Sequence, residues 1–238
     1  MISFFKTIRL KLIDQYKIKK YVFYAIGEII LVVIGILIAL QINNWNNLKI
    51  KKQDEIATYK NIKEQITQNL NELNAIKATN NYYTSQYSYA SSIISALDKS
   101  KMDTLAIMTM NLSQYSDFHG NGSIYETLVN SGDIKLLENS EIQNKLQALE
   151  STYGYINKLE DIHWEINIQE LSPELRGVIN YANLHVVKPE KLYSVEIQNI
   201  FIESIFLTKG KETVYNLAIN AITELIELIN KELESLTA

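Results

Sequence analysis

The chain has 238 residues and a net charge of −4, with 27 acidic residues, 23 basic residues and no cysteine, which excludes disulfides and thiolate chemistry. Residues 1–52 hold nine of the basic residues and two of the acidic ones, which leaves 14 basic against 25 acidic residues beyond position 52. A soluble part with this charge repels phosphate backbones, so we expect no nucleic-acid partner.

A short basic tail occupies residues 1–20, where apolar side chains alternate irregularly with Lys and Arg. This pattern is typical of an amphipathic helix that lies on an anionic membrane surface. It is equally typical of a plain basic flank in front of a membrane span. Under either interpretation we expect the tail to be cytoplasmic.

Residues 21–43 predict a transmembrane helix. Residues 22–42 are apolar except for Glu28 and Gln41, and a helix of that length extends about 31 Å, the thickness of a bilayer's hydrocarbon core. The run is too long for a signal-peptide core, so we expect an uncleaved anchor. Six Lys and Arg precede it and three follow closely. This bias predicts a cytoplasmic N-terminus and an exported C-terminal domain.

One face of this span combines small residues with its only carboxylate. We expect this face to mediate self-association, with Glu28 protonated or hydrogen-bonded between helices. The alternatives for Glu28 are a proton or ion site, or snorkelling without a role. Tyr21 and Trp45 lie where interfacial aromatic anchors belong. The predicted interface consists of Ala25, Glu28, Gly35 and Ala39.

The sequence YAIGEIILVVIGILIALQINNWN, residues 24–46, is long and specific. It resembles the N-terminal signature of an uncharacterised Bacteroidota family of small single-pass membrane proteins (DUF6090-like). A weaker second match, Tyr125 and Leu128 followed by Ser131 and Gly132, resembles the family's mid-domain pattern. The resemblance implies a basic tail, this span and a helical domain, and it implies no activity. Together with the charge bias, it implies a protein of the bacterial inner membrane whose C-terminal domain is periplasmic.

Residues 44–100 predict a long stalk helix that continues the span. Apolar side chains recur at spacings of three and four from Ile56 to Leu97, and neither Gly nor Pro occurs between Gly35 and Gly120. The same stripe is compatible with an imperfect coiled-coil seam.

Residues 101–238 predict a helical bundle that packs on the stalk, so the expected fold class is all-α. Ser123 opens a helix with a capping box, and Gly132 ends it with a left-handed cap. Ser140 opens a second capping box and a helix through Ile166.

Two further helices are predicted at residues 195–207 and 213–236, on either side of Gly210. Nothing in the sequence reads as a convincing strand.

Few residues suggest chemistry. Glu160 and His163 match half of a di-iron motif, but the complete site needs a second such pair and two further glutamates. We therefore predict a solvated helix face there, with no metal and no cofactor. His119, beside Asp117 in a glycine loop, is interpreted as part of a turn. A cluster of tyrosines at residues 82–89 is interpreted as bundle packing in preference to a binding groove.

We therefore expect a non-enzymatic protein that displays a helical scaffold and binds the lipid bilayer, itself or other envelope membrane proteins. One alternative is an accessory subunit of a proton-driven or transport complex that uses Glu28. The other is a periplasmic ligand-sensing bundle, which would need a partner because the cytoplasmic tail is too short for an output domain.

Overall fold

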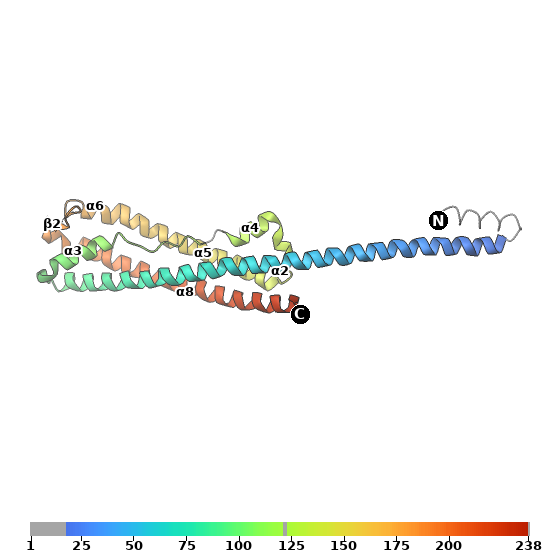
Figure 1. Cartoon of the computed structure of the whole chain (residues 1–238). Helices are drawn as coiled ribbons and strands as arrows, with labels where there is room; N and C mark the ends of the chain where they lie inside the picture. Colours follow the sequence, from blue (N-terminus) through green and yellow to red (C-terminus); the bar gives the residue numbers. More distant parts are fainter. Residues whose placement is uncertain (1–17, 121–122, 238) are drawn as a thin grey trace. The chain divides into compact units, whose positions relative to one another are not determined.

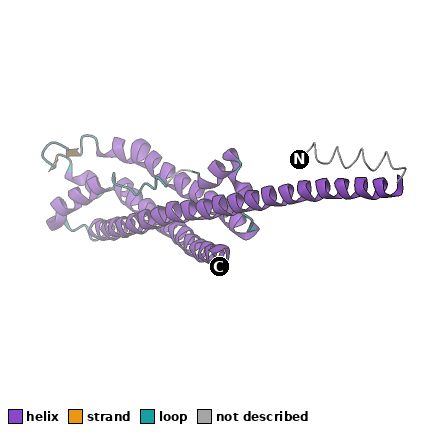
Figure 2. Ribbon diagram, turned by 45° about the vertical axis from the view of Figure 1, so that its right-hand side comes forward, coloured by secondary structure: helices purple, strands orange, loops and turns teal. Residues whose placement is uncertain are grey.

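A computed structural model describes residues 18–120 and 123–237, so most of the predicted basic tail lies outside the described residues. The chain divides into one unit that ends at Asp54 and a second that begins at Glu55. Within the described residues the structure is almost entirely helical, which confirms the all-α class (Figure 2).

Helix α2 (Ile18–Ser95) is the longest element, at 78 residues. It continues without interruption from the apolar run into the second unit, because no Gly or Pro follows Gly35 within it. It ends in a Schellman motif, where the Asp98 N–H donates to the Ile93 carbonyl and Leu97 adopts a left-handed φ of 52°.

The remaining elements are two long helices and a set of short ones. They are η1 (Lys99–Lys101), α3 (Met102–Asn111), α4 (Ile124–Ser131), η2 (Asp133–Leu136), α5 (Ser140–Ile166), the π-helix η3 (Asn167–Leu171), α6 (Ser172–Leu175), β1 (Ile179–Asn180), β2 (His185–Val186), α7 (Pro189–Leu192) and α8 (Val195–Thr237).

In the second unit α2, α5 and α8 lie side by side (Figure 1). Buried residues of α2 recur with alternating steps of four and three from Glu55 to Leu73, then with two steps of seven to Tyr87, which is the heptad spacing of a coiled-coil seam. The seam packs against α5 and α8 of the same chain. Its buried members are Glu55, Tyr59, Ile62, Ile66, Asn69, Leu73, Asn80, Tyr87, Ala90 and Ile94.

A second core lies at the other end of these helices. It joins the end of α2, α3, the start of α8 and the short elements between η3 and α8. The strands β1 and β2 pair there as an antiparallel hairpin. The sequence contains no alternating apolar pattern at these two-residue strands, so the hairpin was not predicted.

Local capping was predicted in part. The Ser123 hydroxyl accepts the Glu126 N–H, and Gly132 has a φ of 82°, as predicted. The N-cap of α5 is Asn139 and not Ser140, because the Asn139 side chain accepts the N–H groups of Glu141 and Ile142.

The prediction of two separate C-terminal helices is wrong. Residues 195–237 form the single helix α8. A glycine in a helix interior costs only about 1 kcal/mol, and α8 buries Phe201 and Thr208 before Gly210 and Tyr215 and Ile222 after it.

Replacing Ile156 by Ala tests the α5 contribution to the main core. Ile156 is fully buried, whereas Ile162 on the same helix is 37% exposed. We expect Ile156→Ala to lower the free energy of unfolding by about 2–5 kcal/mol and Ile162→Ala by less than about 1 kcal/mol. Urea denaturation of the detergent-solubilised full chain, followed by circular dichroism, measures both. Equal losses would contradict the packing of α5.

Candidate functional site: a buried polar cluster and its pockets

The predicted span residues lie on the first segment of α2. In the isolated chain, Glu28, Gly35 and Ala39 are exposed and Ala25 is half-buried. A Cβ added at Gly35 would meet no atom within 4 Å. Self-association through this face stays a prediction.

Of the two predicted interfacial anchors, Trp45 is 66% exposed, and the Lys49 Nζ lies 5.9 Å from the centre of its ring. The side chain of Tyr21, the other predicted anchor, is not among those that the structure describes. Helix α2, which contains the apolar run, is the one helix among the described residues that is long and apolar enough to cross a membrane.

A buried polar cluster lies between α5, α8 and the irregular segment of residues 112–120. Glu160 is 3% exposed and His163 is fully buried, so the predicted solvated helix face is wrong. The prediction failed because both residues face α8 and this segment, a contact that the sequence around them does not reveal. No group of His, Asp and Glu among the described residues is arranged to hold a metal ion.

Glu160 connects two elements through neutral donors. Its Oε2 accepts the Phe118 N–H at 3.0 Å, and its Oε1 accepts the Tyr215 hydroxyl at 2.7 Å. The Tyr215 oxygen also lies 2.8 Å from the Ser116 Oγ. Burial raises the pKa of Glu160, although both hydrogen bonds and the charge of Lys211 oppose the shift. The carboxyl group thus holds the segment against α5 and α8.

Lys211 is fully buried on α8. Its Nζ lies 3.3 Å from the Ser116 carbonyl oxygen and 3.0 Å from His163 Nδ1. Burial lowers the pKa of Lys211 to about 8, while the carboxylates of Glu160 and Asp117 act in the opposite direction. The lysine therefore fixes the same segment from the α8 side.

His163 is neutral at physiological pH, because burial and the neighbouring Lys211 lower its pKa to about 3. Since Nδ1 accepts from Lys211, the ring proton belongs on Nε2. Nε2 has no hydrogen-bond partner among the described residues. The Tyr115 ring covers the imidazole at 5.3 Å between ring centres.

The π-helix η3 follows immediately after α5. Its first residue, Asn167, donates to the Ser113 carbonyl at 3.4 Å and so adds a third attachment of the irregular segment. Such π-turns occur often at functional sites, which favours this end of α5 as a site.

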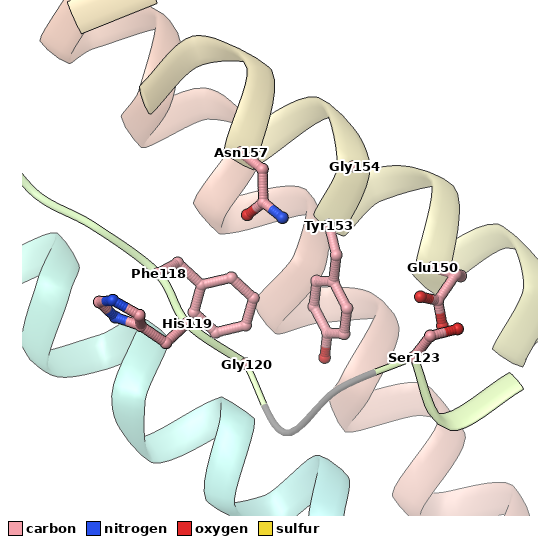
Figure 3. A pocket seen from close by; sticks show the side chains of 8 residues that line it. All are labelled: Phe118, His119, Gly120, Ser123, Glu150, Tyr153, Gly154 and Asn157. Carbon is pink, nitrogen blue, oxygen red and sulfur yellow. The ribbon is translucent and has the colours of Figure 1, made fainter. Parts of the chain in front are cut away.

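Two pockets open beside the cluster. One, of about 210 Å³, is lined by Tyr115, Asp117, Glu160, Asp161 and Trp164. The other, of about 410 Å³, is lined by Phe118, His119, Gly120, Ser123, Glu150, Tyr153, Gly154 and Asn157. Figure 3 shows Tyr153 of this second pocket with Glu150 and Ser123 on one side and Phe118 and His119 on the other.

The predicted turn at His119 and the predicted tyrosine packing have different outcomes. His119 is exposed, and its Nε2 lies 3.4 Å from an Asp117 carboxylate oxygen, as expected for a polar turn.

Tyr87 is fully buried and belongs to the second core, whereas Tyr82 and Tyr89 are 56% and 41% exposed. The prediction that the tyrosines of residues 82–89 pack in the bundle is therefore correct for Tyr87 but not for Tyr82 and Tyr89.

Several residues of the site were not predicted from the sequence: Lys211, Tyr215, Ser116, Tyr115 and Trp164. One signal was available for Lys211, which lies three residues after Thr208 and four before Tyr215 on the core stripe of α8. A lysine at such a position marks a buried charge with partners on facing elements.

The second match of the resemblance, from Tyr125 to Gly132, forms α4 and its cap. Residues 28–208 match a family of unknown function (DUF6090). The chain belongs to this family. No curated protein and no solved structure matches the chain. The DUF6090 match covers the apolar run from Glu28 onward, both pockets, and Ser116, Glu160 and His163 of the buried cluster. It ends before Lys211 and Tyr215, and it assigns the candidate site no role.

The neutral state of His163 predicts an acid-sensitive fold. The pKa of His163 is about 3 in the folded chain against 6.5 in the unfolded chain. The unfolded chain therefore binds more protons between these values, and the free energy of unfolding falls as the pH falls through 6.5 towards 3, by at most about 1.4 kcal/mol per unit. The raised pKa of Glu160 has the opposite effect above 4.5.

The comparison of variants isolates His163. We expect His163→Gln to show a flatter pH dependence of unfolding than the native chain in this window, measured by urea denaturation between about pH 3.5 and 7. The exposed His185 supplies the control. An equal flattening in His185→Gln, or none in His163→Gln, would contradict the assignment.

Proposed function

We propose that this DUF6090 protein is a single-pass, non-enzymatic anchor that displays a helical scaffold module at a bacterial inner membrane. The N-terminus would be cytoplasmic and the bundle periplasmic, in agreement with the excess of Lys and Arg before the span. In this role the bundle binds other envelope membrane proteins, and the span brings copies of the chain together.

The continuity of α2 carries this proposal. The same helix presents an apolar segment with no buried residue, and then the core seam of the second unit. An apolar helix surface with no protein cover is stable in lipid and costly in water. One helix, Ile18–Ser95, therefore supplies both the exposed apolar segment and part of the core of the second unit.

A ligand-sensing bundle is the second candidate, and one observation favours it. The pocket lined by Tyr115 and Trp164 reaches the buried Glu160, which in turn binds the irregular segment. A ligand in this pocket would therefore contact a group that holds the local structure.

Replacing Gly35 by Leu tests self-association. The added side chain would separate two helix backbones that approach closely along the face of Glu28 and Ala39. A loss of about 1.4 kcal/mol of association free energy lowers the association constant tenfold. We expect the crosslinked dimer fraction in native membranes to fall by about tenfold. Gly27 is the matched control, because it lies on the same exposed helix about 100° away from this face. A dimer unaffected by Gly35→Leu would overturn the proposed interface.

Replacing Glu28 by Gln separates scaffolding from proton coupling. Gln retains hydrogen-bonding groups but cannot release a proton. For a scaffold, we expect the crosslinked species and the co-purified partners to be the same as for the native chain. If mass spectrometry identifies a membrane complex whose activity is lost with Glu28→Gln while its assembly persists, the accessory-subunit alternative replaces the scaffold.

A further inference from the structure

We infer that the pocket formed by Tyr115, Asp117, Glu160, Asp161 and Trp164 binds an organic cation, specifically a primary alkylammonium group. The inference rests on the geometry of the bundle alone. It does not depend on membrane anchoring or self-association, so the two proposals can fail separately.

Two of the residues that line the pocket are aromatic. The centres of the Tyr115 and Trp164 rings lie 6.1 Å apart and their planes are tilted by 44°. The Lys211 Nζ already lies 5.6 Å from the centre of the Tyr115 ring, whereas Trp164 is 51% exposed and belongs to neither hydrophobic core. Aromatic faces attract ammonium groups, and Trp does so best. The exposed indole of Trp164 therefore favours a cationic ligand over a neutral apolar one.

Three carboxyl groups form the rest of the lining, on Asp117, Glu160 and Asp161. The nearest buried base is Lys211, which directs its Nζ to Ser116 and His163. Even with Lys211 charged and Glu160 protonated, the carboxylates of Asp117 and Asp161 leave the site negative. A cation is the ligand whose charge this arrangement complements.

Glu160 provides an observation independent of the surface acids. It is only 3% exposed yet lines the pocket, and no basic nitrogen among residues 18–120 and 123–237 forms an ion pair with it. Each of its oxygens accepts one neutral donor. A carboxylate offers about four acceptor positions, so Glu160 retains acceptor capacity for a donor in the pocket. An ammonium group has three donors and no acceptor.

The size of the pocket limits the ligand. A volume of about 210 Å³ lies below the roughly 300–1,000 Å³ of sites for drug-sized molecules. It suits one ammonium group on a short alkyl chain. Two sources share this chemistry: a free diamine, and the side chain of a lysine on a protein partner.

The native pair of tryptophans allows a direct test. The chain contains Trp45 and Trp164 alone, so in a Trp45→Phe background the fluorescence reports on the pocket. The full-length chain in lipid nanodiscs is titrated with 1,5-diaminopentane, and with 1,5-pentanediol as the neutral probe of the same length. We expect a saturable change with the diamine that weakens as salt is raised, and none with the diol.

Charge-neutralising variants identify the carboxylates. Asp161→Asn should weaken diamine binding by about threefold to fivefold, and Glu160→Gln by about tenfold or more. Glu165 is the matched control, because it is an exposed acid on the same helix and does not line the pocket. Glu165→Gln should change the affinity by less than about twofold. Asp161 is exposed, so its variant keeps the test valid if Glu160→Gln does not fold.

No response to the diamine, an equal response to the diol, or equal losses for Asp161→Asn and Glu165→Gln would overturn the inference. Tighter binding of the diamine than of a blocked lysine peptide, acetyl-Gly-Lys-Gly-amide, supports the site with a free diamine as its ligand. Tighter binding of the peptide supports the site with a partner's lysine. If the native chain gives no crosslinked dimer but binds the diamine normally, that result counts against the scaffold and leaves the pocket intact.

Discussion

An uninterrupted helix that has two different surfaces is the constraint on which the rest of this structure depends. Its first segment is apolar on all sides and exposed, whereas its second segment buries a single stripe and is polar on the opposite side. A helix that is apolar all round needs lipid or protein cover, whereas a helix with one stripe needs a partner on one side only. The apolar segment ends at Ile42, and burial along one stripe begins at Glu55, where the second unit begins.

The buried seam of α2 also explains why α5 and α8 have a defined register against it. A purely apolar seam can slide by one heptad at little cost, but a buried polar residue prevents this. Asn69 donates to the Tyr153 hydroxyl of α5, and Asn80 donates to the Thr208 carbonyl of α8. Each asparagine would lose its partner if its neighbour helix moved by one turn, so the two residues specify the alignment.

The sequence predicts the features of this fold that depend on local or periodic information. Apolar length predicts the span, periodicity predicts α2, and Ser123 and Gly132 have capping chemistry that acts over a few residues. The misses share another cause. Packing against other elements decides whether Gly210 breaks a helix. It also decides whether Glu160 and His163 are solvated. Those contacts join residues far apart in the sequence, as in the bonds from Lys211 to His163 and Ser116, and one sequence contains no direct signal for them.

The cost of burying Lys211 and Glu160 points to a role beyond packing. Desolvating two ionisable groups is expensive, and apolar residues of similar size would stabilise a helix interface at least as well. In return these groups bind the backbone of an irregular segment, at the Ser116 carbonyl and the Phe118 N–H, which an apolar side chain cannot do.

Glu160 also lines the pocket beside Trp164. A cation bound there would favour the ionised form of Glu160 and strengthen its bond to the Phe118 N–H, since a charged acceptor makes the stronger hydrogen bond. Under the proposed cation binding, occupation of the pocket would strengthen the attachment of the segment through this one carboxyl group.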